Sequence, residues 1–121
     1  MNKKSNEEWK NEYKDPVTDL IWYTKEFKPM QWEEAMDFAK TYKKGKYRLP
    51  TIQELLPLVD FTKHSPSINS NNFHKCKSSG YWSATSNANI SYYAWNVNFL
   101  NGYANYNNKY FSRYVRLVRN K

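Results

Sequence analysis

Asparagine, tyrosine and arginine side chains gather in the last third of the sequence. The stretch "AWNVNFLNGYANYNN", residues 94–108, is rich in asparagine, although asparagine is depleted in β-strands. An amide donates and accepts hydrogen bonds, tyrosine adds rigid amphipathic area, and arginine offers a planar fork of donors. These residue types predict a surface that binds a polar or anionic partner. The candidate ligand-binding residues are Asn96, Asn98, Tyr103, Asn105, Asn107, Arg113 and Arg116. The alternative is that the four asparagines bond to one another as an internal amide network.

Residues suited to catalysis or metal binding are few in this sequence. His64, His74 and Cys76 are the candidates, but they do not form a four-ligand set of recognisable zinc spacing. A nucleophilic Cys76 would lack an orienting acid in its half of the chain. The only glycines, at positions 45, 80 and 102, do not make a phosphate-binding loop. We therefore expect no catalytic residue, no metal and no cofactor, and a protein that is not an enzyme.

The charge of +8 is unevenly distributed along the chain. All eleven acidic residues lie in the first sixty positions, where eleven Lys and Arg residues balance them. From residue 61 to residue 121 there are eight basic residues and no acidic one. This asymmetry favours an anionic partner for the C-terminal half.

The Asn-rich stretch has the pattern of a β-hairpin. A two-residue turn at Asn101-Gly102 predicts that Leu100 pairs with Tyr103, Asn98 with Asn105, and Asn96 with Asn107. Paired side chains share a face. The predicted core face holds Trp95, Val97, Phe99, Ala104 and Tyr106, and the four asparagines lie together on the other face.

Other segments predict the elements that must position this hairpin. An apolar stripe predicts an amphipathic helix over residues 30–48, with Gly45 as its stop. Thr51 and Glu54 form a capping box that begins a second helix, which Pro57 should keep short or bent. A strand is expected over 20–23, a long loop over 61–80, and further strands at 81–85, 92–99, 103–107 and 113–119. The predicted fold class is α+β with a mostly β C-terminal half.

Length and composition indicate one domain. The chain has 121 residues, of which 18% are aromatic, so we expect a single folded domain over 15–121 with a largely aromatic core. Residues 1–14 are predicted to be a polar N-terminal extension. The start of the chain lacks the apolar run of a signal peptide, and no stretch reaches transmembrane length. We therefore expect a cytoplasmic protein, with association with a cell surface or virion as the alternative.

Four motifs together resemble a known family. "YRLPTIQELLPLVD", "GYWSATS", "YAWNVNFLNGYANYNNK" and "YVRLVR" are similar to the Lcl C-terminal domain, the C-terminal domain of bacterial collagen-like adhesins. The resemblance runs from about Asp15 to Arg119. It implies a C-type-lectin-like fold, in which two helices flank a small antiparallel sheet and the termini lie close together. In "WNV", Val97 stands where calcium-dependent lectins of the wider fold carry an acid, so a calcium–sugar site is not expected.

These observations predict a non-enzymatic binding module. Its expected partner is a sulfated or phosphorylated glycan or an acidic protein surface. The alternative is an intracellular, phage-encoded interaction protein that inhibits a host protein or nucleic-acid complex. Direct nucleic-acid binding is the weaker alternative, because the basic residues and aromatics occur without a known nucleic-acid-binding motif. The sequence does not indicate an oligomeric state.

Overall fold

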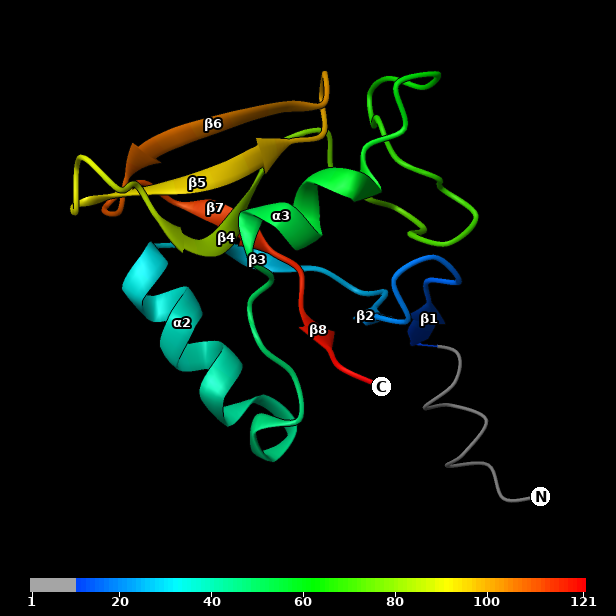
Figure 1. Cartoon of the computed structure of the whole chain (residues 1–121), viewed down its shortest axis with the longest axis horizontal. Helices are drawn as coiled ribbons and strands as arrows, with labels where there is room; N and C mark the ends of the chain where they lie inside the picture. Colours follow the sequence, from blue (N-terminus) through cyan, green and yellow to red (C-terminus); the bar gives the residue numbers. More distant parts are fainter. Residues whose placement is uncertain (1–10) are drawn as a thin grey trace.

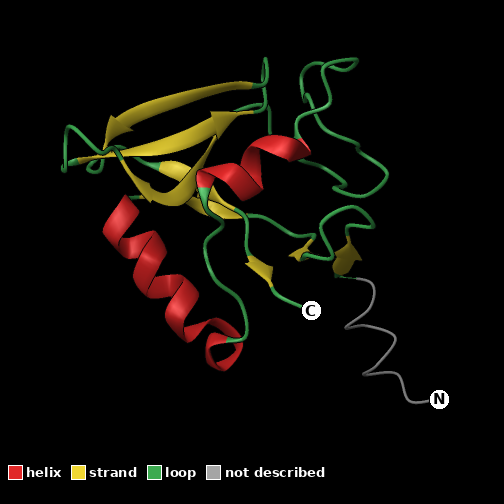
Figure 2. Ribbon diagram, viewed as in Figure 1, coloured by secondary structure: helices red, strands yellow, loops and turns green. Residues whose placement is uncertain are grey.

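A computed structural model describes residues 11–121 (Figure 1). These residues form two sheets and two α-helices, and the C-terminal half consists mostly of strands (Figure 2). The α+β class predicted from the sequence is therefore confirmed.

The smaller sheet brings the two ends of the described chain together. It contains β1 (Glu12–Lys14), β2 (Ile21–Tyr23) and β8 (Val118–Arg119), in the order β1-β2-β8 with antiparallel pairing. Within residues 11–121, the two ends of the chain therefore lie in one sheet, as expected. Residues 12–14, predicted to belong to a polar extension, form a strand of this sheet. The first ten residues of that predicted extension lie outside the described residues.

The first described helix, α2 (Trp32–Thr41), is shorter than the predicted segment 30–48. Its buried stripe is formed by Trp32, Ala35 and Ala39. A 3-10 turn, η1 (Tyr42–Gly45), follows the helix and contains two lysines with left-handed backbone angles. The chain thus leaves the helical conformation just before the predicted glycine stop.

The second helix begins as the sequence predicts. In α3 (Ile52–Leu55), the Thr51 side chain accepts from the Glu54 N–H and the Glu54 carboxylate accepts from the Thr51 N–H. Pro57 lies in the 3-10 turn η2 (Leu56–Leu58) that follows directly. The prediction of a short helix is therefore confirmed.

The larger sheet has five strands in the order β3-β7-β4-β5-β6. They are β3 (Phe27–Met30), β7 (Arg113–Val115), β4 (Gly80–Ser86), β5 (Tyr93–Asn98) and β6 (Tyr103–Asn108). Strand β3 was not predicted, and its Pro29 is tolerated because β3 lies at the sheet edge. The predicted last strand, 113–119, is divided between the two sheets as β7 and β8.

Two aromatic clusters form the core on either side of the larger sheet. One cluster, with α2, includes Trp32 and Trp82, whose indole N–H groups donate to Ser83 O and Met30 O at 2.9 and 2.8 Å. The other includes Tyr81 and Val97 from the sheet and Leu55 from α3. The predicted loop over 61–80 has no strand before residue 80, yet it places Ile68, Phe73 and Cys76 in this second cluster.

Candidate functional site

The hairpin of β5 and β6 sorts its side chains as predicted but in a different register. Asn96 pairs with Asn105 and Asn98 pairs with Tyr103, so the predicted pairs Leu100–Tyr103, Asn98–Asn105 and Asn96–Asn107 are wrong. The register differs by two residues, an even number, so the four asparagines still share one face. We call this face, together with Gly80 and Arg113 from the neighbouring strands, the amide face.

The connection between the strands is longer than the predicted two-residue turn because the Phe99 backbone bonds to Ser67 and Ser79 and not to β6. Phe99 is fully buried, and its backbone N–H donates to Ser79 O at 2.9 Å. The loop therefore spans residues 99–102. The Asn98 side chain stabilises it by accepting from the Leu100 N–H at 2.9 Å, and Gly102 supplies a left-handed backbone at φ +84°.

The predicted core face of the hairpin is only partly covered. Val97 is fully buried, but Tyr106 is 45% exposed. Trp95 is half-buried and packs edge-on against Tyr106, with ring centroids 5.1 Å apart. The prediction that this face is buried in the core is therefore confirmed at the end of the hairpin nearest the turn. It is wrong at the other end, where aromatic rings are exposed to solvent.

Three residues of the amide face form a hydrogen-bonded network. The Asn107 carbonyl Oδ1 accepts from Asn96 Nδ2 at 2.8 Å and from Arg113 Nη2 at 3.2 Å. Asn96 is 2% exposed, so this amide is satisfied inside the protein. The internal-network alternative therefore describes two of the four asparagines.

Gly80 allows Arg113 to reach this network. A Cβ at position 80 would lie 2.7 Å from Arg113 Cδ and 3.2 Å from Asn96 Oδ1. Because glycine has no side chain, the arginine crosses β4 from β7 and approaches the hairpin. Its Nη1 donates to the Ser112 carbonyl at 2.8 Å, which further fixes the guanidinium.

The other members of the amide face are accessible. Asn105 is exposed, Asn98 is half-buried, and Tyr103 is 63% exposed. Arg113 is half-buried. The structure therefore brings six of the seven candidate residues together. Apart from the hydrogen-bonded pair Asn96 and Asn107, the other four of these six have side chains that solvent can reach.

Arg116 lies apart from the amide face in the core. Its side chain is 1% exposed. The guanidinium donates to Thr24 O at 2.9 Å and to Glu26 Oε1 at 3.2 Å. It also lies over the Phe73 ring, 4.7 Å from the ring centroid. Tyr81 also donates to this carboxylate. We leave Arg116 out of the site because its charge is already neutralised and inaccessible.

The charge asymmetry along the sequence is partly cancelled in three dimensions. Arg119 donates from Nε and Nη2 to the Glu12 carboxylate at 2.9 and 3.0 Å. These bonds, opposed by partial burial and assisted by Tyr47, lower the pKa of Glu12 to about 2. Two arginines of the C-terminal half are therefore paired with acids from the N-terminal half, a pairing that the sequence alone did not reveal.

The histidine and cysteine candidates do not form a metal-binding cluster among residues 11–121. No three His, Cys, Asp or Glu side chains in that range lie close enough to hold a metal ion. His64 and His74 are exposed, whereas Cys76 is buried with its Sγ 3.3 Å from the Tyr81 hydroxyl. Burial, followed by the influence of Cys76 and Glu26, raises the pKa of Tyr81, so this phenol stays protonated.

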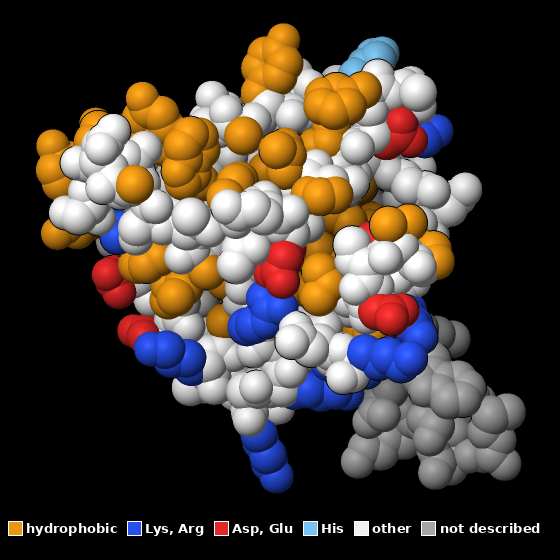
Figure 3. Space-filling model, in the orientation of Figure 1, with side chains coloured by type: hydrophobic (Ala, Val, Ile, Leu, Met, Phe, Trp, Pro, Cys, Tyr) orange, Lys and Arg blue, Asp and Glu red, His pale blue; other side chains and the backbone are white. Residues whose placement is uncertain are grey.

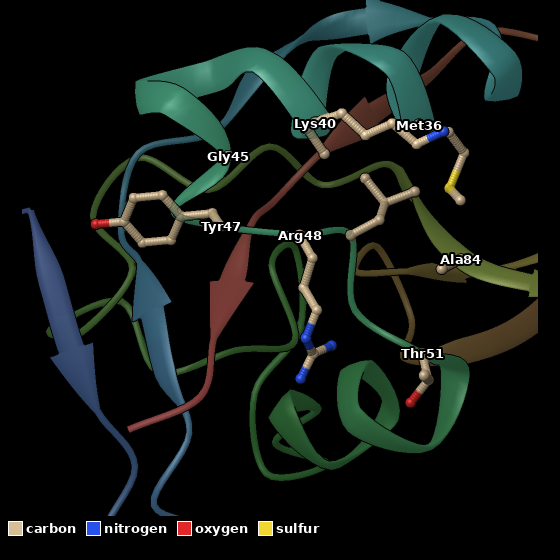
Figure 4. A pocket seen from close by; sticks show the side chains of 9 residues that line it. Met36, Lys40, Gly45, Tyr47, Arg48, Thr51 and Ala84 are labelled. Atoms are coloured by element: carbon tan, nitrogen blue, oxygen red, sulfur yellow. The ribbon is translucent and has the colours of Figure 1, made fainter.

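One hollow of the described surface is lined by no residue of the amide face. This groove of about 460 Å³ lies between α2 and the segment that leads into α3, with Met36 and Lys40 on one side and Thr51 on the other (Figure 4). Its lining is mainly apolar, and its arginine, Arg48, is paired with Glu54 at 2.6 Å. The groove therefore offers shape but little polar chemistry.

The match to a family model spans this whole architecture. The model of the Lcl C-terminal domain matches residues 11–119, which include both sheets, both helices and the amide face. The chain belongs to the Lcl C-terminal domain family. A comparison with curated proteins finds no match. None of the helices in residues 11–121 is long and apolar enough to cross a membrane.

Proposed function

We propose that this domain is a non-catalytic binding module that recognises an anionic partner through its amide face. The observation that carries the proposal is the state of Arg113. The other three arginines pair with carboxylates, namely Arg48 with Glu54, Arg116 with Glu26 and Arg119 with Glu12. Arg113 bonds only neutral oxygens among the described residues, so its positive charge is fixed in place and uncompensated.

The surroundings of Arg113 suit an oxyanion that carries or adjoins hydroxyl groups. Asn98, Asn105 and Tyr103 lie on the same face and provide amide and phenol groups that donate and accept. A sulfate or phosphate on a glycan would meet the guanidinium while neighbouring hydroxyls meet the amides. A carboxylate cluster on an acidic protein would satisfy the same donors.

A binding role is favoured over catalysis by the residue types of this face. By strand register the amide face includes no carboxylate, histidine or cysteine from the described strands. General acid–base chemistry needs such a titratable group beside the reacting atoms. Amide and guanidinium groups instead provide recognition by hydrogen bonding.

Heparin affinity chromatography with a salt gradient tests this proposal, using Arg113→Gln and the charge-matched Lys121→Gln. Loss of a charge-assisted hydrogen bond costs about 1.5–3 kcal/mol, so Arg113→Gln should elute at clearly lower salt and bind heparin about tenfold or more weakly in calorimetry. Lys121→Gln should shift elution only slightly. Equal shifts in the two variants would show non-specific attraction by net charge and would overturn the proposal.

A further inference from the structure

The two edges of the five-stranded sheet differ in their protection. Strand β3 carries Lys28 and Pro29, and lysine and proline are residues that discourage pairing at a sheet edge. Strand β6, at the opposite edge, has the sequence "YANYNN", six residues without charge or proline. The edge formed by β6 is therefore open to a further strand.

The backbone of β6 has hydrogen-bonding groups that face this open edge. The Tyr93 N–H donates to Ile90 O at 2.9 Å and the Tyr93 C=O accepts from Asn87 N at 2.8 Å, so the backbone of Tyr93 points away from β6. In an antiparallel pair, the direction in which the backbone groups point alternates from one residue to the next, and directly opposite residues either both face each other's strand or both face away. Trp95 and Val97 therefore point away from β6, as Tyr93 does, and their partners Tyr106 and Ala104 point away from β5. No backbone group among residues 11–121 outside the strand ladder bonds to them.

Exposed apolar side chains lie on the β5–β6 hairpin and in the loops at its ends. Six of the nine large hydrophobic side chains exposed among the described residues lie in residues 92–111, and hydrophobic side chains gather where β5 and β6 run (Figure 3). They are Tyr92, Leu100, Tyr103, Tyr106, Tyr110 and Phe111. Tyr103 and Tyr106 lie on opposite faces of β6, so an added strand would find aromatic contacts on both sides.

We propose that the outer edge of β6 binds an extended segment of another protein by β-strand addition, with Ala104 and Tyr106 supplying the backbone hydrogen bonds. The net charge of +8 opposes pairing with a second copy and favours a segment with acidic residues. The inference does not depend on anion binding at Arg113, because the backbone groups of the edge lie on a different part of the hairpin.

Hydrogen exchange on the full chain, observed by NMR, tests the proposal. The probe is a peptide of about twelve residues selected from a displayed random library on the intact protein. Binding should slow exchange of the Ala104 and Tyr106 amides by about tenfold or more. The Asn105 and Asn107 amides, which already face β5, should change little. A selection that enriches no peptide, or a peptide that leaves Ala104 and Tyr106 unprotected, would overturn the inference.

Two variants and a modified peptide separate backbone pairing from side-chain contact. Ala104→Pro removes an outward N–H without removing a β5–β6 bond and should weaken peptide binding about tenfold; Ala104→Val keeps the N–H and should bind normally. If the proline variant unfolds, peptides N-methylated at alternate residues make the same test. One of the two methylation patterns should abolish binding, and unchanged binding of both would overturn the inference.

Two further measurements test whether the partner is another protein and whether strand addition is independent of Arg113. Concentration-dependent dimerisation in sedimentation that Ala104→Pro abolishes would assign the edge to a second copy and overturn the proposed partner. Arg113→Gln should change peptide affinity no more than the charge-matched Lys121→Gln does, so failure of heparin binding and failure of strand addition are distinguishable. Loss of peptide binding in Arg113→Gln would instead place the peptide on the amide face and count against the edge.

Discussion

The clasp between Glu12 and Arg119 gives a pH-dependent contribution to stability that can be calculated. Glu12 accepts from both Nε and Nη2 of Arg119 and lies 3.6 Å from Lys46 Nζ. Glu12→Gln keeps the shape of the side chain but removes its charge. We therefore expect this variant to be less stable than the parent near neutral pH and nearly equal to it in strong acid.

The direction and magnitude of this contribution to the free energy of unfolding follow from the pKa of Glu12. The pKa lies near 2 in the folded protein against 4.5 for an unpaired glutamate, so the charged pair contributes about 3 kcal/mol at most. Partial solvent exposure reduces the expected contribution to about 1–2 kcal/mol. Because the folded pKa is the lower one, the contribution is complete above pH 4.5 and is lost as the pH falls toward 2.

Urea unfolding followed by tryptophan fluorescence measures this difference. The free energies of unfolding of the parent and Glu12→Gln should differ near pH 7, differ by less than half as much near pH 3, and converge near pH 2. The control is Asp19→Asn, which breaks an exposed Lys14–Asp19 pair at 3.8 Å and should cost less than about 0.5 kcal/mol. A difference that stays constant from neutral to acidic pH would refute the role of the ionised clasp.

Three further substitutions test the site and the fold. Gly80→Ala places a methyl group 2.7 Å from Arg113 Cδ and should weaken heparin binding about as much as Arg113→Gln does; normal binding would show that the guanidinium has another route. Arg116→Met leaves the half-buried Glu26 carboxylate without its charged partner and should lower the free energy of unfolding by about 3 kcal/mol, measured in urea. A loss below about 1 kcal/mol would contradict the ion-pair assignment. Thr51→Ala removes the cap of α3 and should cost about 1 kcal/mol, measured by thermal unfolding, with an unchanged melting temperature as the contrary result.

The sequence was informative where the relevant interactions are local. The Thr51–Glu54 capping box joins residues three apart, so its residue types are sufficient to predict it. The sorting of the asparagines onto one face was also predictable, because alternation in a strand survives any even error in register. The turn length was not predictable, because the Phe99 backbone pairs with Ser67 and Ser79 from the preceding long loop and not with β6.

The candidate site was only partly predictable for the same reason. Arg113 and Arg116 are three residues apart and look alike in the sequence. They separate because Glu26, ninety positions from Arg116, pairs with one guanidinium in the core, whereas no carboxylate of residues 11–121 pairs with the other. The importance of Gly80 likewise emerges only when β4 and β7 lie side by side.

The three-stranded sheet determines how this domain would respond to a pulling force. Strands β1 and β8 both run antiparallel to β2, which lies between them, so β1 and β8 run parallel to each other. A force that draws residue 12 and residue 119 apart would slide these strands along β2 and load their hydrogen bonds together in shear. The Glu12–Arg119 clasp crosses the same sheet. Tension between the ends would therefore be resisted here first, while the hairpin with its amide face and open edge stays outside the path of the load.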